Sequence, residues 1–325
     1  MFIKDFILKR RLVIRMFSLV VFIAAISMAC AQDYPNKPIR IVTSEAGGGN
    51  DYVARLISPE ISNLLGQPVI VDNRHSNTVG EIVSKAAADG YTLLVYGGTF
   101  WLAPLLQKTP YDPIRDFSPI SLIEMSPSVL VVNPALQVNN VEDVIALAKG
   151  NPGRPNYASS VTGSSPHLAA ELFKAMAGIN IFRVNYKGNG PALASLMSGE
   201  VQLMFVTPAS AMPLVKSGRL RALAVTSAKS SPLVPGIPAV AASGLPGYEV
   251  TRVTEMLAPA KLPIPIIVTL NQVVVQVLNK PEVKEKFFNS GSEVIPGSPE
   301  KLAAMMKADM AKFGKVIKDA GISAE

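Results

Sequence analysis

The stretch Ile41–Arg55, IVTSEAGGGNDYVAR, decides how the rest of this chain folds. It starts with β-branched residues that predict a strand, passes through Gly47, Gly48 and Gly49, and continues as a helical pattern. A glycine-rich loop between a strand and a helix exposes backbone N–H groups, which commonly bind an anion. The stretch therefore predicts an α/β fold with an anion-binding loop.

The same alternation of strands and helices continues along the chain. Strands are predicted at 38–44, 67–73, 91–97, 128–133, 155–160, 179–186, 201–206 and 220–227. Helices are predicted at 51–65, 78–90, 141–150, 166–178, 191–200, 208–218, 268–280, 281–288 and 299–321. This order predicts two mainly parallel sheets flanked by helices, and hence two lobes. The helical tail can pack back on the first lobe.

Residues 1–31 predict a secretory signal peptide. An apolar run at 16–29 follows a basic segment and ends in the small-residue cleavage site Ala29-Cys30-Ala31. The basic residues are Lys4, Lys9, Arg10, Arg11 and Arg15. A run of about 14 apolar residues is too short to span a bilayer as a stable helix. We expect cleavage after Ala31 and a periplasmic protein. A lipid anchor at Cys30 stays open as the alternative, although Ser27 makes a weak lipobox.

The composition of the mature chain argues against several classes of protein. It contains no further cysteine, so no disulfide holds the fold, and no later apolar stretch is long enough to span a membrane. Removing the five basic residues and one acidic residue of the signal lowers the formal net charge from +7 to +3. A balance this mild, without a Lys/Arg cluster, argues against nucleic acid as a partner.

Motifs of nucleotide, zinc and hydrolytic enzymes are missing. After Gly49 the chain continues Asn50-Asp51-Tyr52, which is no P-loop, and no third glycine completes a dinucleotide fingerprint. The only two histidines, His75 and His167, are poor material for a zinc site, and no Gly-x-Ser-x-Gly motif is present. We therefore expect no cofactor, no metal and no catalytic residue. A periplasmic hydrolase or isomerase is a third alternative, which turnover of a bound ligand would reveal.

Several predicted helices start with capping residues. Asn50 is placed to cap the first helix, and Thr78 has capping-box spacing to Glu81. Three further helices start at the pairs Ser165-Pro166, Gly190-Pro191 and Thr207-Pro208, which put proline at the first helical position. Helix starts that follow parallel strands lie on one side of the sheet, where their N–H groups and dipoles favour an anion. Each one taken alone is equally consistent with an ordinary cap.

Long segments of the chain carry a resemblance to a known family. They include YPNKPIRIVTSEAGGGNDYVARL, LGQPVIVDNR, ADGYTLL, PYDPIRDFSPIS, YASSVTGSSPHLAAELFKAMAGI, YKGNGPALASLMSGEVQLMF, SGRLRALAVTS, GLPGYEV and LAPAKLP. In these segments, which span the mature chain in order, the sequence resembles the Bug (TctC-like) family of periplasmic solute-binding proteins. Members of this family are the extracytoplasmic receptors of tripartite tricarboxylate transporters.

The resemblance implies a two-lobed type II periplasmic-binding-protein fold that closes on a small organic acid. Lobe one would be 32–131 plus 254–325 and lobe two 132–253, with SVLVVN and YEVTRVTEM as the crossing hinge segments. The implied partners are a carboxylate ligand and the permease subunits of a tripartite tricarboxylate transporter. A membrane signalling protein without its own permease is the alternative partner. No signature of oligomerisation is present, so a monomer is expected.

The resemblance also implies the site. Two loops, Ser44–Asp51 and His75–Thr78, would hold a carboxylate by backbone N–H groups and bridging waters, and the second lobe would add residues at two helix starts. The candidate ligand-binding residues are Ser44, Glu45, Ala46, Gly47, Gly48, Gly49, Asn50, Asp51, His75, Ser76, Asn77, Thr78, Gly98, Thr99, Gly163, Ser164, Ser165, His167, Lys187, Val206, Thr207 and Arg252.

The pocket departs from the family pattern. The first loop, TSEAGGGND, has lost two prolines and gained Glu45, and the second, NRHSNTVGE, is shorter and has lost glycines. Val206 replaces a common Asp, and RVTE stands where SWFG is frequent. In one interpretation, Arg252 pairs with a ligand carboxylate, and Glu45 or Glu255 recognises a cationic or hydroxyl group of the ligand. In the other, these residues face solvent or pair with each other. Lys187 is a ligand partner or an ordinary loop lysine. The identity of the acid stays open.

Overall fold

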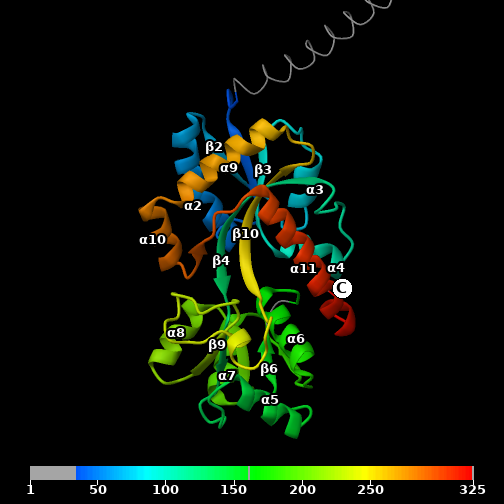
Figure 1. The fold of residues 1–325 in the computed structure, drawn as a ribbon, viewed down its shortest axis with the longest axis vertical. Coiled ribbons are helices and arrows are strands. Elements are labelled where there is room, and N and C mark those ends of the chain that lie inside the picture. Colours follow the sequence, from blue (N-terminus) through cyan, green and yellow to red (C-terminus); the bar gives the residue numbers. More distant parts are fainter. Residues whose placement is uncertain (1–33, 160–161, 324–325) are drawn as a thin grey trace, which may run out of the picture.

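The computed structural model describes residues 34–159 and 162–323. The predicted signal peptide, including Cys30, lies outside the described residues. The described chain forms two lobes placed end to end along the long axis of the molecule (Figure 1). Of the described helices, none has the length and apolar composition needed to cross a membrane.

The first lobe is built on a six-stranded sheet with the order β11-β4-β10-β3-β1-β2. Its elements are β1 (Ile39–Thr43), α2 (Gly49–Leu65), β2 (Val69–Asn73), α3 (Val79–Ser84), β3 (Thr92–Gly97), α4 (Thr99–Leu106), β4 (Phe117–Pro127), β10 (Thr251–Pro259), α9 (Ile264–Leu278), α10 (Pro281–Asn289), β11 (Glu293–Val294) and α11 (Pro299–Asp319). The C-terminal helices thus pack on the first lobe, as the sequence suggested. Strand β1 lies between β2 and β3 and is parallel to both.

The second lobe is built on a five-stranded sheet with the order β7-β6-β8-β5-β9. Its elements are β5 (Val129–Val132), α5 (Val141–Gly150), β6 (Tyr157–Ser159), α6 (Ser165–Ala177), β7 (Arg183–Asn185), α7 (Asn189–Ser198), β8 (Leu203–Val206), α8 (Pro208–Lys216), β9 (Arg221–Val225) and the short 3-10 helix η1 (Val240–Ala242). In each sheet most strands share one direction; β10 and β11 in the first and β5 in the second run against it. The predicted α/β fold with two mainly parallel sheets is confirmed.

Two crossing segments join the lobes (Figure 1). Strand β4 leads into β5 with only Ser128 between them, and β10 returns the chain beside β4. The Ser128 N–H group donates to Thr226 Oγ1 (2.7 Å), and the Val250 N–H group donates to the Thr226 carbonyl (2.8 Å). The bounds expected from sequence, 132 and 253, fall inside β5 and β10, so we propose 128–250 as the second lobe. The sequence analysis missed β4, whose segment is interrupted by prolines.

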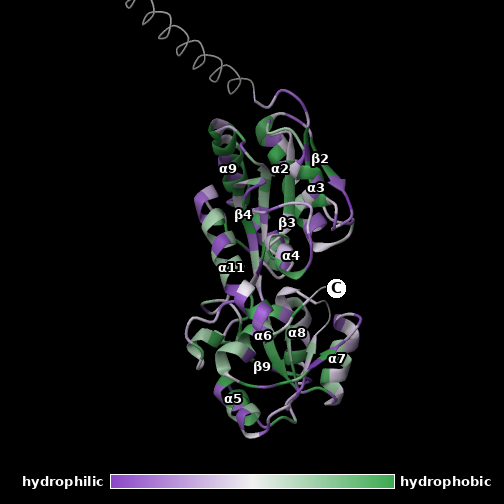
Figure 2. Cartoon of the chain, turned by 90° about the vertical axis from the view of Figure 1, so that its right-hand side faces the viewer, coloured by the Kyte–Doolittle hydropathy of each residue, from purple (hydrophilic) through white to green (hydrophobic). Residues whose placement is uncertain are grey.

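The first sheet has a separate apolar core on each face. Ile41 packs with Ile57 of α2 and Leu270 of α9, whereas its neighbour Val42 packs in the cluster that contains Trp101 of α4. This alternation follows from the two-residue period of a strand. Each such buried side chain contributes roughly 1.5–3 kcal/mol. Hydrophilic residues gather on the outer loops and helix faces (Figure 2).

Glu255 on β10 is a buried carboxyl group, which contradicts its reading as a ligand contact. It is 0% exposed, and neither of its oxygens has a hydrogen-bond partner among the described residues. Burial raises the pKa of Glu255 well above its ordinary value, and the nearby Glu124 carboxylate raises it further. Burial therefore favours the protonated form of Glu255 in the folded protein.

Glu255→Gln should change how stability depends on pH. The folded protein keeps this proton at pH values where the unfolded chain, with an ordinary pKa of 4.5, releases it. Glu255 thus stabilises the folded state fully below the pKa of the unfolded chain. This stabilisation is lost as the pH rises through the raised pKa of the folded state. We expect Gln to raise the melting temperature at about pH 8 and to change it little at about pH 4. The control is Glu282→Gln, an exposed residue of α10; equal pH profiles for both variants would contradict the assignment.

Gly80→Ala should destabilise the first lobe. A Cβ at Gly80 would lie 2.3 Å from Cε1 of Tyr111. That ring is stacked on Phe100 at 4.6 Å and meets Phe117 edge-on, so a shift away from the new Cβ would disturb both ring contacts. We expect a loss of about 1–3 kcal/mol in urea unfolding. In the control Gly150→Ala the new Cβ meets nothing within 4 Å, so no loss is expected there.

Candidate functional site

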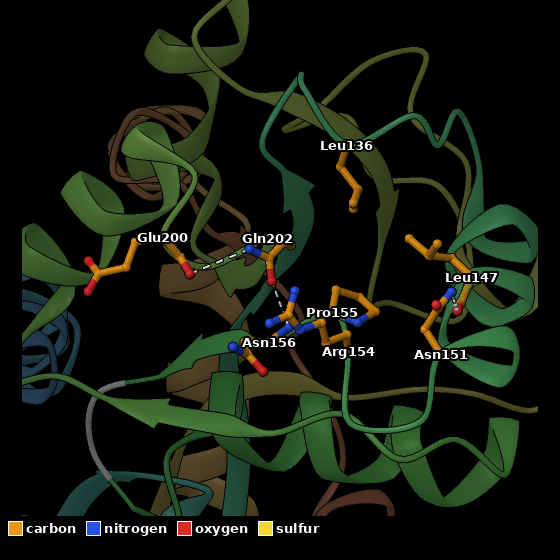
Figure 3. A pocket seen from close by; sticks show the side chains of 8 residues that line it. All are labelled: Leu136, Leu147, Asn151, Arg154, Pro155, Asn156, Glu200 and Gln202. Carbon is orange, nitrogen blue, oxygen red and sulfur yellow. Dashed lines mark hydrogen bonds between the residues drawn. The ribbon is translucent and has the colours of Figure 1, made fainter.

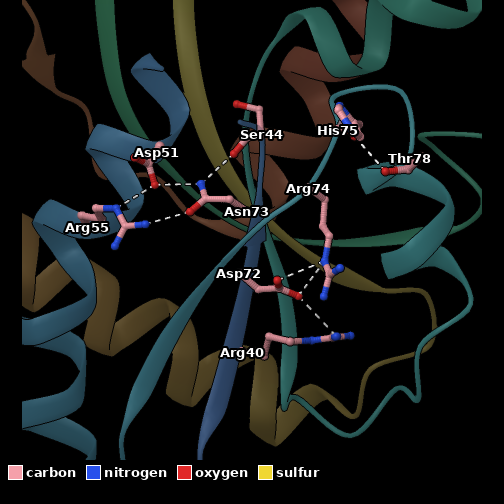
Figure 4. A network of polar contacts seen from close by, with 9 residues as sticks. All are labelled: Arg40, Ser44, Asp51, Arg55, Asp72, Asn73, Arg74, His75 and Thr78. Atoms are coloured by element: carbon pink, nitrogen blue, oxygen red, sulfur yellow. Dashed lines mark hydrogen bonds and ion pairs between the residues drawn. The ribbon is translucent and has the colours of Figure 1, made fainter. Parts of the chain in front are cut away.

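The glycine loop after β1 is held by the buried carboxylate of Asp51. Its oxygens accept the Gly47 N–H group (2.8 Å) and the Asn73 amide (2.8 Å), and Asn73 also donates to the Ser44 carbonyl (2.7 Å; Figure 4). Burial by itself would raise the pKa of Asp51, but these donors and the Arg55 guanidinium outweigh it and lower the pKa. Asp51 is thus ionised and committed to the loop, which corrects its prediction as a ligand contact.

The loop presents the start of α2 next to Arg252. Gly47 has φ +81°, a left-handed conformation that favours glycine, and Gly48 is the residue before the helix. A Cβ at Gly49 would lie 3.5 Å from Arg252 Nη1. The first N–H groups of a helix have no intrahelical partner. A guanidinium therefore lies beside a helix N-terminus at an exposed loop, since Glu45 to Gly49 are all exposed.

Asn50 does not cap α2, contrary to the sequence-based expectation. The helix begins at Gly49, two residues before the predicted start at 51, and Gly48 occupies the cap position. The Asn50 side chain instead donates to Ser44 Oγ (3.1 Å), and a Cβ at Gly97 would lie 3.4 Å from its oxygen. Asn50 thus connects the loop to the end of β3.

Arg252 is held by a carboxylate that the sequence analysis did not identify. Its Nη2 lies 3.0 Å from Glu124 Oε1 and 3.2 Å from Oε2, and Glu124 is fully buried on β4. Thr254 also donates to Glu124 (2.7 Å). The Arg252 side chain is 38% exposed, so its charge remains accessible from the loop. Arg252 therefore pairs with neither Glu45 nor Glu255, and its Nη1 lies on the side of the glycine loop.

Glu45 joins the first loop to the second. Its Oε1 accepts the Ser76 N–H group (2.9 Å), and its Oε2 accepts the Ser76 hydroxyl (2.6 Å). These hydrogen bonds lower the pKa of Glu45 to about 2, and His75 Nδ1 lies 3.5 Å away. Glu45 faces solvent, with a side chain that is 53% exposed, and does not pair with Arg252; its contact with Ser76 was not predicted.

Thr78 lies at the start of α3 without the expected capping box. Its backbone is already helical (φ −106°, ψ −19°), and no side-chain cap hydrogen bond forms. Both its N–H group and its hydroxyl donate to the His75 carbonyl, each at 2.8 Å (Figure 4). The second loop is therefore a tight turn held by hydrogen bonds between its first residue, His75, and its last, Thr78.

A pocket of about 390 Å³ lies between the lobes. Five predicted residues line it together: Ser76, Asn77, Thr99, Gly163 and Ser164. Its remaining wall comes mainly from α4 and the segment after it, which the sequence analysis did not include. The residues of that wall include Tyr96, Phe100, Ala103, Leu106, Lys108, Pro110 and Tyr111. The signal that could have found them is their position directly after the third predicted strand.

His167 shapes the second-lobe side of this pocket. It is 2% exposed, and its Nδ1 accepts the Gly163 N–H group (3.0 Å). Burial, followed by the charge of Arg183, lowers the pKa of His167 to about 4, so the ring is neutral at pH 7. This corrects the expectation that His167 faces the ligand. A Cβ at Gly163 would lie 2.5 Å from Leu106 Cδ1, so the lobes touch here.

The other predicted residues lie at strand or helix ends. Gly98 is the residue before α4, which begins at Thr99. Helices α6 and α7 begin at Ser165 and Asn189, so proline is not the first helical residue in either of them. Thr207 precedes α8, which does begin with proline.

Most of the predicted residues, including the glycine loop and Arg252, are not among those that line the interlobe pocket, and two of them belong to other parts of the second lobe. Val206 is 1% exposed and belongs to the core of the second lobe, so it is not a ligand contact. Lys187 is exposed ahead of α7 and is not among the residues that line the interlobe pocket. The structure therefore does not group either of them with the two loops of the first lobe.

The second lobe contains another cavity, of about 420 Å³ (Figure 3). It lies at the starts of β6 and β8, and Arg154 and Pro155 are among its lining residues. Gln202 accepts the Asn156 N–H group (2.9 Å) and donates to the Gly199 carbonyl (3.0 Å), so its amide is already used. Across the described residues, no group of three or more His, Cys, Asp or Glu side chains could hold a metal ion. The interlobe pocket remains the candidate site.

Comparisons with known proteins match this arrangement over almost the whole chain. The family model described as "Tripartite tricarboxylate transporter family receptor" (TctC) matches residues 53–322. Protein BugT of Bordetella pertussis is 33% identical over 311 residues, which cover 93% of this chain and 95% of the relative.

Solved structures agree. "R. palustris Rpa4515 with adipate" is 36% identical, with a TM-score of 0.71 over 90% of this chain and 99% of that one. MatC (Rpa3494) from Rhodopseudomonas palustris with bound malate is 27% identical, with a TM-score of 0.68 over 87% and 100%. A TctC solute binding protein from Polaromonas, 22% identical with a TM-score of 0.80 over 88% and 99%, supports the fold alone. This chain belongs to the TctC family of tripartite tricarboxylate transporter receptors, which are solute-binding proteins and not enzymes.

Proposed function

We propose that this protein captures a small organic acid between its lobes and delivers it to the permease of a tripartite tricarboxylate transporter. The observation that carries the proposal is the position of Arg252 Nη1 beside Gly49 at the start of α2. Relatives solved with adipate and with malate support a carboxylate as the ligand. Export by the signal peptide at 1–31, a periplasmic location and a monomeric state are parts of the same proposal.

The chemistry of the loop suits a carboxylate. The dipole of a helix favours an anion at its N-terminus by roughly 0.3–1 kcal/mol when exposed. A hydrogen bond between a guanidinium and a carboxylate adds to this because both partners are charged. Since Arg252 Nη2 is held by Glu124, Arg252 offers Nη1 to the ligand from a fixed position. A fixed donor loses less entropy on binding than a mobile one.

Closure of the lobes would couple binding to delivery. An acid that contacts Thr99 in one lobe and Ser164 in the other favours the state in which both line one pocket. Ser231 already donates to Glu293 (2.6 Å) across the lobes, on the side of α8 and α10. The chain between lobes is short at Ser128, which suits a hinge. The permease then recognises the closed form; capture of permease subunits by cross-linking in membranes tests this step.

The direct test is a thermal-shift screen of the mature protein, residues 32–325. The compounds are dicarboxylates, tricarboxylates, aromatic acids and acidic amino acids, with neutral and cationic controls. A ligand at a hundred times its Kd stabilises by about 2.7 kcal/mol, which a melting curve resolves. Shifts from acids support the proposal. Shifts from neutral or cationic compounds alone would overturn it.

Gly48→Asp should weaken acid binding without unfolding the protein. Gly48 is the residue before α2, with φ −81° and ψ 171°, a conformation that Asp adopts readily and in which it caps helices. Its carboxylate would occupy the first N–H groups of α2 and repel the ligand. We expect at least about a tenfold loss of affinity in calorimetry, with the melting temperature kept.

The control for this variant is Gly48→Ala. It introduces the same Cβ, 3.3 Å from the Glu45 carbonyl oxygen, without the charge. Affinity should therefore fall clearly less than in Gly48→Asp. Unchanged affinity in Gly48→Asp would show that the ligand does not use this loop.

A further inference from the structure

The glycine loop contains a carboxylate, that of Glu45, close to the interlobe pocket. Both donors of Ser76, its N–H group and its hydroxyl, are used by the Glu45 carboxylate at 2.9 and 2.6 Å. With a pKa lowered to about 2 by these bonds, Glu45 is ionised at neutral pH. A fixed negative charge therefore lies at this edge of the candidate site before any ligand binds.

The charge lies close to the interlobe pocket. Ser76, which Glu45 binds, is one of the lining residues, and so is Tyr96. The pKa of Tyr96 is raised, first by burial and also by the negative charge of Glu45. A ligand group that enters the pocket beside Ser76 thus meets a carboxylate and finds the two Ser76 donors taken.

The pocket wall beyond Ser76 is mainly apolar. Phe100, Ala103, Leu106, Pro110 and Tyr111 contribute to it, and the Tyr111 ring is stacked on Phe100. Such a stretch of wall favours a hydrocarbon or aromatic group, which loses less on leaving water than a hydrated carboxylate does.

We propose that Glu45 makes this receptor selective for acids with one carboxylate and an apolar body, and against dicarboxylates. The inference rests on the proposed function, in which the single carboxylate is held beside Gly49 and Arg252. The apolar body then extends past Ser76 into the interlobe pocket. A second carboxylate at that end is rejected by charge repulsion and by the lack of free Ser76 donors.

Lys108 is the opposing charge. It is the cation among the residues that line the pocket, and its attraction would favour a dicarboxylate. Lys108 is exposed, so solvent screens its ammonium group and its long side chain is not held in one place. Glu45 is exposed as well, but its two hydrogen bonds to Ser76 hold its charge in one place at the edge of the pocket.

Calorimetry with matched acids tests the inference. The pairs are hexanoate with adipate and benzoate with terephthalate, which differ within each pair by one carboxylate. We expect wild-type protein to bind the monocarboxylate of each pair at least about tenfold more tightly. In Glu45→Gln, which keeps the side-chain shape, the ratio of the two affinities should fall about tenfold. Glu45→Ala serves as a second variant if Gln disturbs the loop, as judged by melting temperature.

Two controls separate the inference from its alternatives. Glu81→Gln makes the same change in net charge on α3, where Glu81 pairs with Lys85, and should leave the ratio unchanged. A wild-type preference for dicarboxylates that is lost in Lys108→Gln would overturn the inference while leaving the receptor function intact. So would a ratio that does not respond to either Glu45 variant. If no acid in the wider screen binds at all, the proposed function fails, and the inference with it.

Discussion

The buried carboxylate of Asp51 is the interaction on which the candidate site depends. It accepts the Gly47 N–H group and the Asn73 amide, while Asn73 also holds the Ser44 carbonyl. The ends of β1 and β2 and the start of α2 are thereby tied at one point. A buried ion needs such partners to stay charged, so the loop and its carboxylate support each other. The glycine loop has one conformation before a ligand arrives, which lowers the entropic cost of binding.

Four acidic residues around this loop show how surroundings decide the role of a carboxylate. Asp51 has several donors and organises the loop, and Glu45 has the Ser76 donors and joins two loops. Glu124 is fully buried and holds Arg252 in place. Glu255 has no hydrogen-bond partner among the described residues, and burial raises its pKa. The same carboxyl group thus holds the glycine loop in Asp51, links two loops in Glu45 and pairs with Arg252 in Glu124. In Glu255 it lies in the core without a hydrogen-bond partner among the described residues.

Specific polar and apolar contacts join the two lobes. Thr226, the residue after β9, accepts hydrogen bonds from the N–H groups of Ser128 and Val250. Both crossing segments are thereby tied to the second lobe. Leu106 of α4 touches Gly163, which brings the end of α4 against the start of α6. The pocket therefore owes much of its shape to α4 and the segment after it.

The sequence by itself determined most of the strands and helices, although not β4 or α4, and the division into two lobes; it also predicts a site at strand ends. These follow from periodicity and from glycine-rich turns, which act within a few residues. Tertiary structure alone decided which groups meet. Glu124 and Arg252 are 128 positions apart, and Glu45 and Ser76 are 31 apart. No local pattern relates such pairs, because their contact depends on how β4, β10 and the loops after β1 and β2 are packed together.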